Sequence, residues 1–245
     1  MQPVSKLIFI ILLSLSYIAT SSADTAVSYK DSRDQMMKKR AAASKKKPMF
    51  TPAERQLMKD AMMQTKKKYP HPGLKKGETA PDFTLINAFG KPVSLYDQLK
   101  RGPVVLVFYR GAWCPFCNLH LHVLKKSLPE FKKYKAQLIT VTPQRPDKSL
   151  GQIKKDAYPF EILSDLNDKV MKQYRLYYEL SPELDQLYKK KGLDVEKFNG
   201  KGRAALPVPG TFIIGADKVI KAVHAQHDYK ERMEPADIIK VLMRL

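Results

Sequence analysis

The chain contains two cysteines, Cys114 and Cys117, separated by two residues. No other cysteine in the 245 residues can build a disulfide framework, so the pair indicates redox or metal chemistry. Cys114 follows the apolar run PVVLVFY and the four-residue loop RGAW, and it directly precedes Pro115. Proline is favoured at the first position of a helix. We therefore expect a buried strand, a short loop, and Cys114 at the N-cap of a helix.

This position predicts an ionised Cys114. Backbone N–H groups and the positive end of the helix dipole stabilise an anion at a helix N-terminus. We therefore expect the pKa of the Cys114 thiol to lie well below the ordinary value of about 8.5. Arg110 would lower it further if its side chain folds back. Cys117 is one turn further into the helix, so it is expected to be more buried, less activated, and placed to attack a sulfur at Cys114.

Two alternatives compete with a redox pair. The cysteines could be structural residues that happen to be close, or ligands of a metal in the string Cys114-x-x-Cys117-x-x-His120-x-His122. His120 and His122 lie about 200° apart around a helix, so both cannot face one ion. No second cysteine or histidine pair completes a zinc finger. We therefore predict no metal, and His120 is better explained as a structural residue.

The string LPVPGT, which precedes a predicted strand at Thr211–Ile214, could shape the same site. Proline cannot donate to a strand ladder, so it marks an edge or a special turn. A cis peptide before Pro209 would present backbone polar groups beside Cys114. An ordinary trans proline in a loop is the alternative. Trp113, next to the pair, could serve as a platform for substrate or as packing.

The surrounding sequence alternates strands and helices, which predicts an α/β layered fold. The apolar run over 103–109 is expected to be buried on both faces of the sheet. Strands are expected at 81–85, 92–95, 103–109, 137–141, 160–163, 211–214 and 219–225. Helices are expected at 115–134, 147–157, 167–174, 181–191 and 235–242. No internal repeat and no glycine-rich phosphate loop is found.

Residues 24–76 form a basic extension ahead of the expected domain at 77–245. They hold 15 Lys and Arg against five Asp and Glu, which accounts for half of the formal net charge of +20. The capping box TPAE and apolar residues at helical spacing predict one helix from Pro52 to Lys68. The charge could hold the extension on an anionic membrane surface, or it could belong to a solvated arm. Nucleic acid is not an expected partner.

The first 23 residues have the pattern of a secretory signal peptide. Lys6 supplies the positive charge, an apolar stretch runs from Leu7 to Leu15, and small residues end at Ala23. The apolar stretch is too short for a comfortable span of about 20 residues, although an uncleaved anchor is the alternative. We therefore expect an exported protein, periplasmic or secreted, in a compartment that permits disulfides.

The ordered strings GETAPDFTLINAFGKPVSLYDQL, PVVLVFYRGAWCPFCNLHLHVL, TPQRPDKSL, FEILSDLNDKV, LPVPGTFII and DYKERMEP carry a resemblance. From about Thr51 to the C-terminus, the chain resembles the alkyl hydroperoxide reductase and thiol-specific antioxidant (AhpC/TSA) superfamily. It is most similar to the peroxiredoxin-like branch that has an Arg-Gly-x-Trp-Cys-Pro-[aromatic]-Cys site. The resemblance implies a thioredoxin-like fold, with a central mixed β-sheet flanked by helices and a basic helical N-terminal extension.

The resemblance also implies a function. Cys114 would attack a hydroperoxide, Cys117 would resolve it, and a thioredoxin-like or other thiol reductant would reduce the resulting Cys114–Cys117 disulfide, without a further cofactor. Pro209 would be a cis-proline beside the site. The chain departs from typical peroxiredoxins, which have Thr where Gly111 stands and Arg where Pro209 stands. The alternative is therefore a thioredoxin-like oxidoreductase that acts on protein disulfides.

Overall fold

The computed structural model describes residues 26–44 and 48–245. Seven of its strands form one mixed sheet in the order β2-β1-β5-β4-β3-β8-β9, and β6 and β7 form a separate two-stranded sheet. The strands are β1 (Thr84–Asn87), β2 (Pro92–Ser94), β3 (Val104–Phe108), β4 (Gln137–Thr142), β5 (Glu161–Ser164), β6 (Tyr177–Glu179), β7 (Ala205–Pro207), β8 (Gly210–Ile214) and β9 (Ile220–Ala225). β3 pairs in parallel with β4 and antiparallel with β8, so the strand that leads to the cysteines is central.

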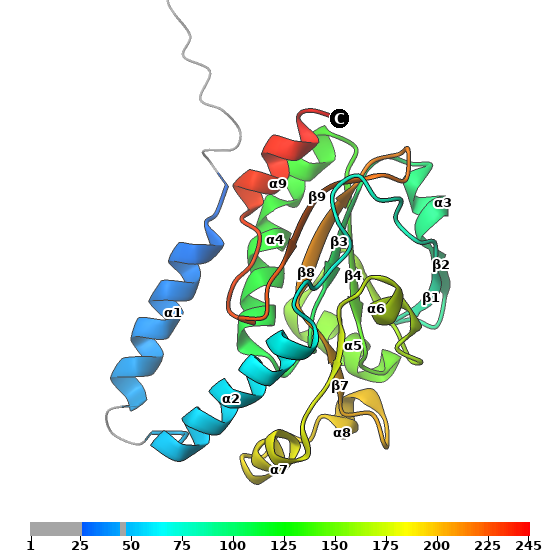
Figure 1. Cartoon of the computed structure of the whole chain (residues 1–245). Coiled ribbons are helices and arrows are strands. Elements are labelled where there is room, and N and C mark those ends of the chain that lie inside the picture. Colours follow the sequence, from blue (N-terminus) through cyan, green and yellow to red (C-terminus); the bar gives the residue numbers. More distant parts are fainter. Residues whose placement is uncertain (1–25, 45–47) are drawn as a thin grey trace, which may run out of the picture.

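Helices cover both faces of this sheet (Figure 1). The helices are α1 (Tyr29–Ser44), α2 (Pro52–Lys68), α3 (Leu95–Leu99), α4 (Pro115–Lys133), α5 (Pro146–Asp156), α6 (Lys169–Gln173), α7 (Pro182–Lys190), α8 (Glu196–Asn199) and α9 (Pro235–Leu242). Successive side chains of a strand point to opposite faces. Val105 and Val107 of β3 therefore pack against α4 and α9, whereas Leu106 and Phe108 pack in the core that includes α3 and α6.

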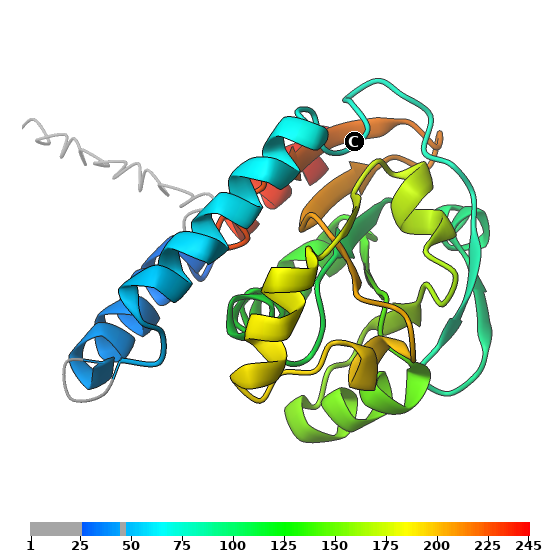
Figure 2. The same ribbon diagram turned by 60° about the horizontal axis from the view of Figure 1, so that its bottom comes forward.

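The basic segment forms two helices that pack on the sheet domain. α2 starts with the expected capping box, in which Thr51 Oγ1 accepts from the Glu54 N–H at 3.2 Å and a Glu54 carboxylate oxygen accepts from the Thr51 N–H at 2.9 Å. It runs beside α7 (Figure 2), with Ala61 buried against Leu184. α1 packs against α4 through Tyr29, which is 1 % exposed.

The sequence predicted the main elements of the sheet domain, and the structure confirms them with ends shifted by a few residues. The expected hairpin around Phe89 is the antiparallel pair β1–β2. The helix expected from Pro52 to Lys68 is α2. The prediction missed α1, α3, α8, β6 and β7. The expected signal peptide, residues 1–23, lies outside the described residues. Among the helices that are described, none is both long and apolar enough to span a bilayer.

Candidate redox site

The two cysteines lie where β3 passes into α4. Cys114 is the N-cap residue of α4, with extended backbone angles (φ −87°, ψ 112°), and Pro115 follows in the first turn. This is the placement that the sequence predicted. Both thiols are free, and each cysteine is only 1 % exposed. Contrary to the sequence prediction, Cys117 is therefore no more buried than Cys114, because apolar side chains around the helix start cover both residues.

The loop that precedes Cys114 is held by a contact that requires glycine. Gly111 has φ +147°, in the region that favours glycine, and a Cβ there would lie 2.5 Å from Nε1 of Trp113. The Trp113 indole therefore occupies the space that a side chain at position 111 would need. Its ring also stacks on the Arg110 guanidinium, 4.8 Å from the ring centroid, so Trp113 packs within the site.

A network of hydrogen bonds supports the same loop. Gln144, which follows β4, accepts a hydrogen bond from the Ala112 N–H at 3.0 Å. Asn118 of α4 donates to the Ala112 carbonyl at 2.6 Å and accepts from Gln152 of α5 at 2.9 Å. The buried Tyr109 hydroxyl donates to Gln152 at 2.8 Å. The network fixes the turn between β3 and α4, and with it the position of Cys114.

Arg232 contacts one of the two thiols directly. Its side chain is buried, and Nη2 lies 3.3 Å from Sγ of Cys117. Nη1 donates to the carbonyls of Tyr229 and Glu231 at 2.5 and 2.6 Å, which holds the guanidinium in place. The residue comes from the segment between β9 and α9, far from the cysteines in sequence. A cation in hydrogen-bond contact with a thiol favours the thiolate.

The charges around the pair favour a thiolate at Cys117, whereas the sequence predicted one at Cys114. Burial opposes ionisation of Cys117, but the hydrogen bond with Cys114 and the charges of Arg232 and Arg110 outweigh it and lower the pKa of Cys117 to about 5. Burial, and then the hydrogen bond and charge of Cys117, hold the pKa of Cys114 well above its ordinary value. The lowered pKa that the sequence predicted for Cys114 is not found there, because the cation in direct contact lies at Cys117. No side chain caps the helix at Cys114.

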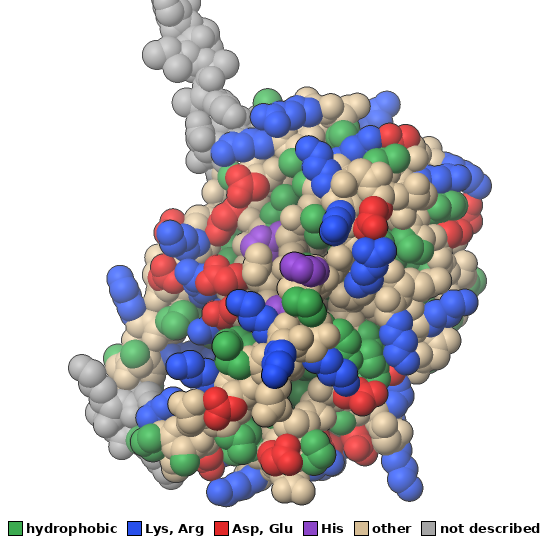
Figure 3. Space-filling view, viewed as in Figure 1, with side chains coloured by type: hydrophobic (Ala, Val, Ile, Leu, Met, Phe, Trp, Pro, Cys, Tyr) green, Lys and Arg blue, Asp and Glu red, His purple; other side chains and the backbone are tan. Residues whose placement is uncertain are grey.

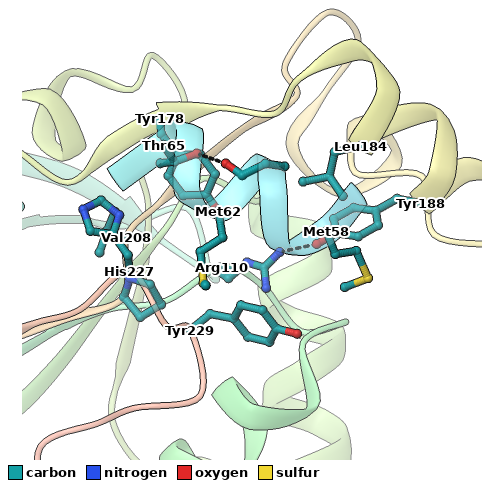
Figure 4. Close-up of a pocket in the computed structure, with 12 residues that line it drawn as sticks. Met58, Met62, Thr65, Arg110, Tyr178, Leu184, Tyr188, Val208, His227 and Tyr229 are labelled. Carbon is teal, nitrogen blue, oxygen red and sulfur yellow. Dashed lines mark hydrogen bonds between the residues drawn. The ribbon is translucent and has the colours of Figure 1, made fainter. Parts of the chain in front are cut away.

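Arg110 lies in a small pocket (Figure 4), which has a volume of about 40 Å³ and is lined by neither cysteine. Its Nη2 donates to the Tyr188 hydroxyl at 3.0 Å, and its guanidinium lies 4.7 Å from the Tyr229 ring centroid. Met58 and Met62 of α2 add apolar side chains to the lining. The pocket therefore joins a buried cation to an apolar lining, with room for only a very small molecule.

Pro209 lines this pocket, but not in the expected conformation. All peptide bonds of the described residues are trans, so the predicted cis bond before Pro209 is wrong. β7 ends at Pro207 and β8 begins at Gly210, so the chain passes almost directly from one strand into the next. Extended trans backbone makes this connection, and the Val208 N–H donates to the Leu176 carbonyl at 2.6 Å.

The sequence predicted that Arg110, Trp113, Pro115 and Pro209 shape the site. In the structure the first three lie at or just before the start of α4, and Pro209 lines the pocket that holds Arg110. The prediction missed Arg232 and the polar residues that support the loop. Their signal was present, since Gln144 belongs to the string TPQRPDKSL and Arg232 to DYKERMEP.

The two histidines of the alternative metal site lie in different surroundings. His120 is buried and its ring packs edge-on against Tyr29 at 5.3 Å, whereas the His122 side chain is 46 % exposed beside Asp156. The described part of the chain holds no group of three or more His, Cys, Asp or Glu residues that could bind a metal ion.

Three comparisons place this geometry among known proteins. A family model described as the AhpC/TSA family matches residues 76–223. The chain is 35 % identical over 99 residues to "Peroxiredoxin Q, chloroplastic" of Sedum lineare, a match that covers 40 % of this chain and 53 % of that protein. It is 31 % identical over 109 residues to "Peroxiredoxin Bcp" of Escherichia coli K12, covering 44 % and 69 %. The chain thus spans about half the length of most of the curated relatives that it matches.

Solved structures support the fold. The crystal structure of the peroxidoxin BcpB from Mycobacterium tuberculosis superposes with a TM-score of 0.57 at 22 % identity, covering 70 % of this chain and 98 % of that one. A yeast mitochondrial 1-Cys peroxiredoxin gives a TM-score of 0.56 at 18 % identity, covering 69 % and 75 %. The predicted thioredoxin-like fold, a mixed sheet flanked by helices, is therefore confirmed.

Proposed function

The chain belongs to the AhpC/TSA family, and from this premise we propose that it reduces hydroperoxides through the Cys114–Cys117 dithiol. One thiolate attacks the peroxide and becomes a sulfenic acid, and the other thiol condenses with it to form a disulfide. A thioredoxin-like or other thiol reductant then restores the dithiol. The redox-active disulfide is the only cofactor that this reaction needs.

The observation that carries the proposal is the burial of two free thiols beside guanidinium groups. Each cysteine is 1 % exposed, and Arg232 contacts Cys117 at 3.3 Å. A buried thiol is inert unless a positive environment stabilises its thiolate. Here the environment supplies that charge. A small hydroperoxide can approach such a site with less rearrangement than the disulfide of a folded protein requires.

Stopped-flow oxidation of the reduced protein by hydrogen peroxide tests the proposal. Trp113 is the only tryptophan in the chain and lies within the site, so its fluorescence reports the change. We expect a second-order rate far above that of a free thiol, lost in the double variant Cys114→Ser/Cys117→Ser. Arg101→Met, at an exposed arginine of the sheet domain, is the matched control and should keep the rate. A wild-type rate equal to that of a free thiol contradicts the proposal.

A second candidate is thiol–disulfide exchange with protein substrates. It is favoured by the CxxC pair at a helix N-terminus and by Gly111 and Pro209 at the positions where typical peroxiredoxins have Thr and Arg. Reduction of insulin by the dithiol form distinguishes the two functions. Rapid insulin reduction together with a slow peroxide rate would favour exchange over peroxide reduction.

Export and membrane contact stay predictions. Lys66, Lys67 and Lys68 are exposed in the last turn of α2, which supports contact with anionic lipid. On the face shown in Figure 3, however, Lys and Arg are spread with Asp and Glu among them. Salt-dependent binding to vesicles that contain phosphatidylserine, compared with the triple variant K66Q/K67Q/K68Q, tests the contact. Binding that is unchanged in this variant would argue against a role for α2.

A further inference from the structure

Two arginines lie buried in the site without a carboxylate partner among the described residues. Arg110 is 3 % exposed and Arg232 is 6 % exposed, and the Nε atom of each has no hydrogen-bond partner. A buried cation is costly unless an anion or dense hydrogen bonding compensates it. An anion beside the two guanidinium groups would offset this cost, and the two thiols are close enough to supply it.

The acidic residues nearest to Arg232 in sequence are engaged elsewhere. Asp228 pairs with Lys230 at 3.4 Å, and Glu231 pairs with Arg33 of α1 at 2.5 Å. The carboxylate of Glu234 accepts the backbone N–H groups at the start of α1. Arg232 itself donates to two carbonyls and to Sγ of Cys117. Among these partners only Cys117 can carry a negative charge.

Arg110 does not select one thiol in this way. It donates to the Tyr188 hydroxyl, and its guanidinium lies between the rings of Trp113 and Tyr229. Its charge therefore acts on both sulfurs from a distance. Among the described residues no cation contacts Cys114 directly, and its side chain makes no capping hydrogen bond at the N-cap.

The other titratable groups around the pair are neutral near pH 7. Burial raises the pKa of the surrounding tyrosines above the ordinary value and lowers the pKa of the neighbouring histidine. These groups are Tyr29 from α1, Tyr109 at the end of β3, Tyr178 from β6, Tyr229 from the segment after β9, and His120 from α4. The charges that remain are Arg110, Arg232 and one thiolate.

We propose that Cys117 is the attacking thiolate and Cys114 the resolving thiol, with Arg232 as the residue that selects Cys117. This assignment of roles rests on the proposed peroxide reduction. The Cys117 sulfur attacks one peroxide oxygen, an S–O bond forms as the O–O bond breaks, and the alkoxide takes a proton from solvent to leave as an alcohol. The Cys114 sulfur then attacks the sulfenic sulfur, and its proton leaves with the expelled hydroxide as water. The dithiol has lost two electrons and the hydroperoxide has gained them.

Thiolate absorbance near 240 nm, followed against pH in reduced single-cysteine variants, tests the assignment. In Cys114→Ser, the remaining Cys117 should titrate well below the ordinary thiol value. In Cys117→Ser, the remaining Cys114 should titrate at or above that value. Adding Arg232→Met to Cys114→Ser should raise the pKa of Cys117 by about 1–3 units, and Arg232→Lys should restore part of the difference because it keeps the charge. The reverse order of the two thiols would overturn the proposal.

Trapping of the sulfenic acid separates the roles of the cysteines from the proposed function. With hydrogen peroxide and dimedone, the adduct should form on Cys117 in Cys114→Ser, and Cys117→Ser should give none on Cys114. An adduct on Cys114 with equal speed would overturn the assignment. If neither variant reacts faster than a free thiol while Cys117 still titrates low, peroxide reduction fails and the charge assignment stands. Because the serine variants are nearly isosteric, their circular dichroism should match that of the wild type.

Discussion

The two N-terminal helices meet different parts of the redox site. α1 contacts the segment that carries Arg232. The Tyr29 hydroxyl donates to the Lys230 carbonyl at 2.7 Å, and the Glu234 carboxylate accepts the N–H groups of Tyr29 and Lys30, each at 2.8 Å. A carboxylate at this position caps α1 from another part of the chain and interacts favourably with its dipole.

α2 lies instead over the pocket that holds Arg110. Met58 and Met62 line that pocket, and Glu54 at the helix start pairs with Lys190 and Lys191 at the end of α7. The N-terminal segment therefore contacts the site in two ways. α1 supports the segment that carries the cation in contact with Cys117, whereas α2 contributes side chains to the pocket that holds Arg110.

The largest expected effect tests the charge on the α1 side. The pKa of Cys117 is lowered to about 5 in the folded protein, against about 8.5 for a free thiol. Between these values the folded state binds fewer protons than the unfolded state, so stability should rise with pH, by about 1.4 kcal/mol per unit. The contribution of the Cys117 thiolate to stability should be lost as pH falls through 5. Urea unfolding of the reduced protein at several pH values measures the slope.

Cys117→Ser is the control for this slope and should flatten it. The pKa of Cys114 is raised by burial and by Cys117, so its contribution has the opposite sign and should reduce stability only above the ordinary thiol value. An equal slope in the wild type and in Cys117→Ser would mean that another group carries the pH dependence.

The next effect concerns the cap that links α1 to the Arg232 segment. Glu234→Gln replaces one of two acceptor oxygens by a donor that faces a backbone N–H, which should cost about 1–2 kcal/mol. The melting temperature should fall by about 2–4 °C for each kcal/mol. The pKa of Cys117 should rise, because Arg232 is held less firmly. Differential scanning calorimetry and thiolate absorbance measure the two effects.

Glu231→Gln is the matched control in the same segment. The Glu231 side chain is 49 % exposed and makes a surface pair with Arg33, so its loss should change stability by less than about 1 kcal/mol. Its backbone carbonyl, which Arg232 contacts, is unchanged. If both variants raise the pKa of Cys117 equally, the cap on α1 has no special role in holding the cation.

A smaller effect is expected at the second arginine. Arg110→Met removes a charge that acts on both thiols from a distance, so the pKa of Cys117 should rise by less than about 1 unit, below the effect of Arg232→Met. Thiolate absorbance measures the two variants side by side. A larger rise for Arg110→Met would shift the role of selecting the thiol from the α1 side to the α2 side.

The sequence predicted the sheet domain well because its signals are local. The apolar run of β3, the prolines at helix starts and the capping box of α2 each act within a few residues. The N-cap position of Cys114 could be predicted for the same reason. The ionised thiol could not, since it depends on Arg232, which approaches Cys117 only after the whole sheet has formed. α1 was missed because Tyr29 and Glu234 hold it through contacts far apart in sequence.

The trans bond at Pro209 lies between β7 and β8, and the local string LPVPGT did not reveal β7. The structure also explains why Gly111 stands where typical peroxiredoxins have Thr. The indole of Trp113 fills the space of a side chain there. Counted from Cys117 instead of Cys114, the position three residues upstream is Cys114 itself, a thiol where typical peroxiredoxins have a hydroxyl.

The smallest expected effect tests the cover on the α2 side. Met58→Ala shortens a side chain in the lining of the pocket that holds Arg110, so a reagent that reaches the thiols by way of this pocket should enter more easily. The rate of peroxide oxidation should rise about two- to fivefold, equivalent to less than about 1 kcal/mol, with the pKa of Cys117 unchanged. Met63→Ala is the matched control, because Met63 lies on the same helix and is 53 % exposed. An equal rate in the two variants would show that Met58 does not limit access, and a change in pKa would show that α2 also acts on the charge.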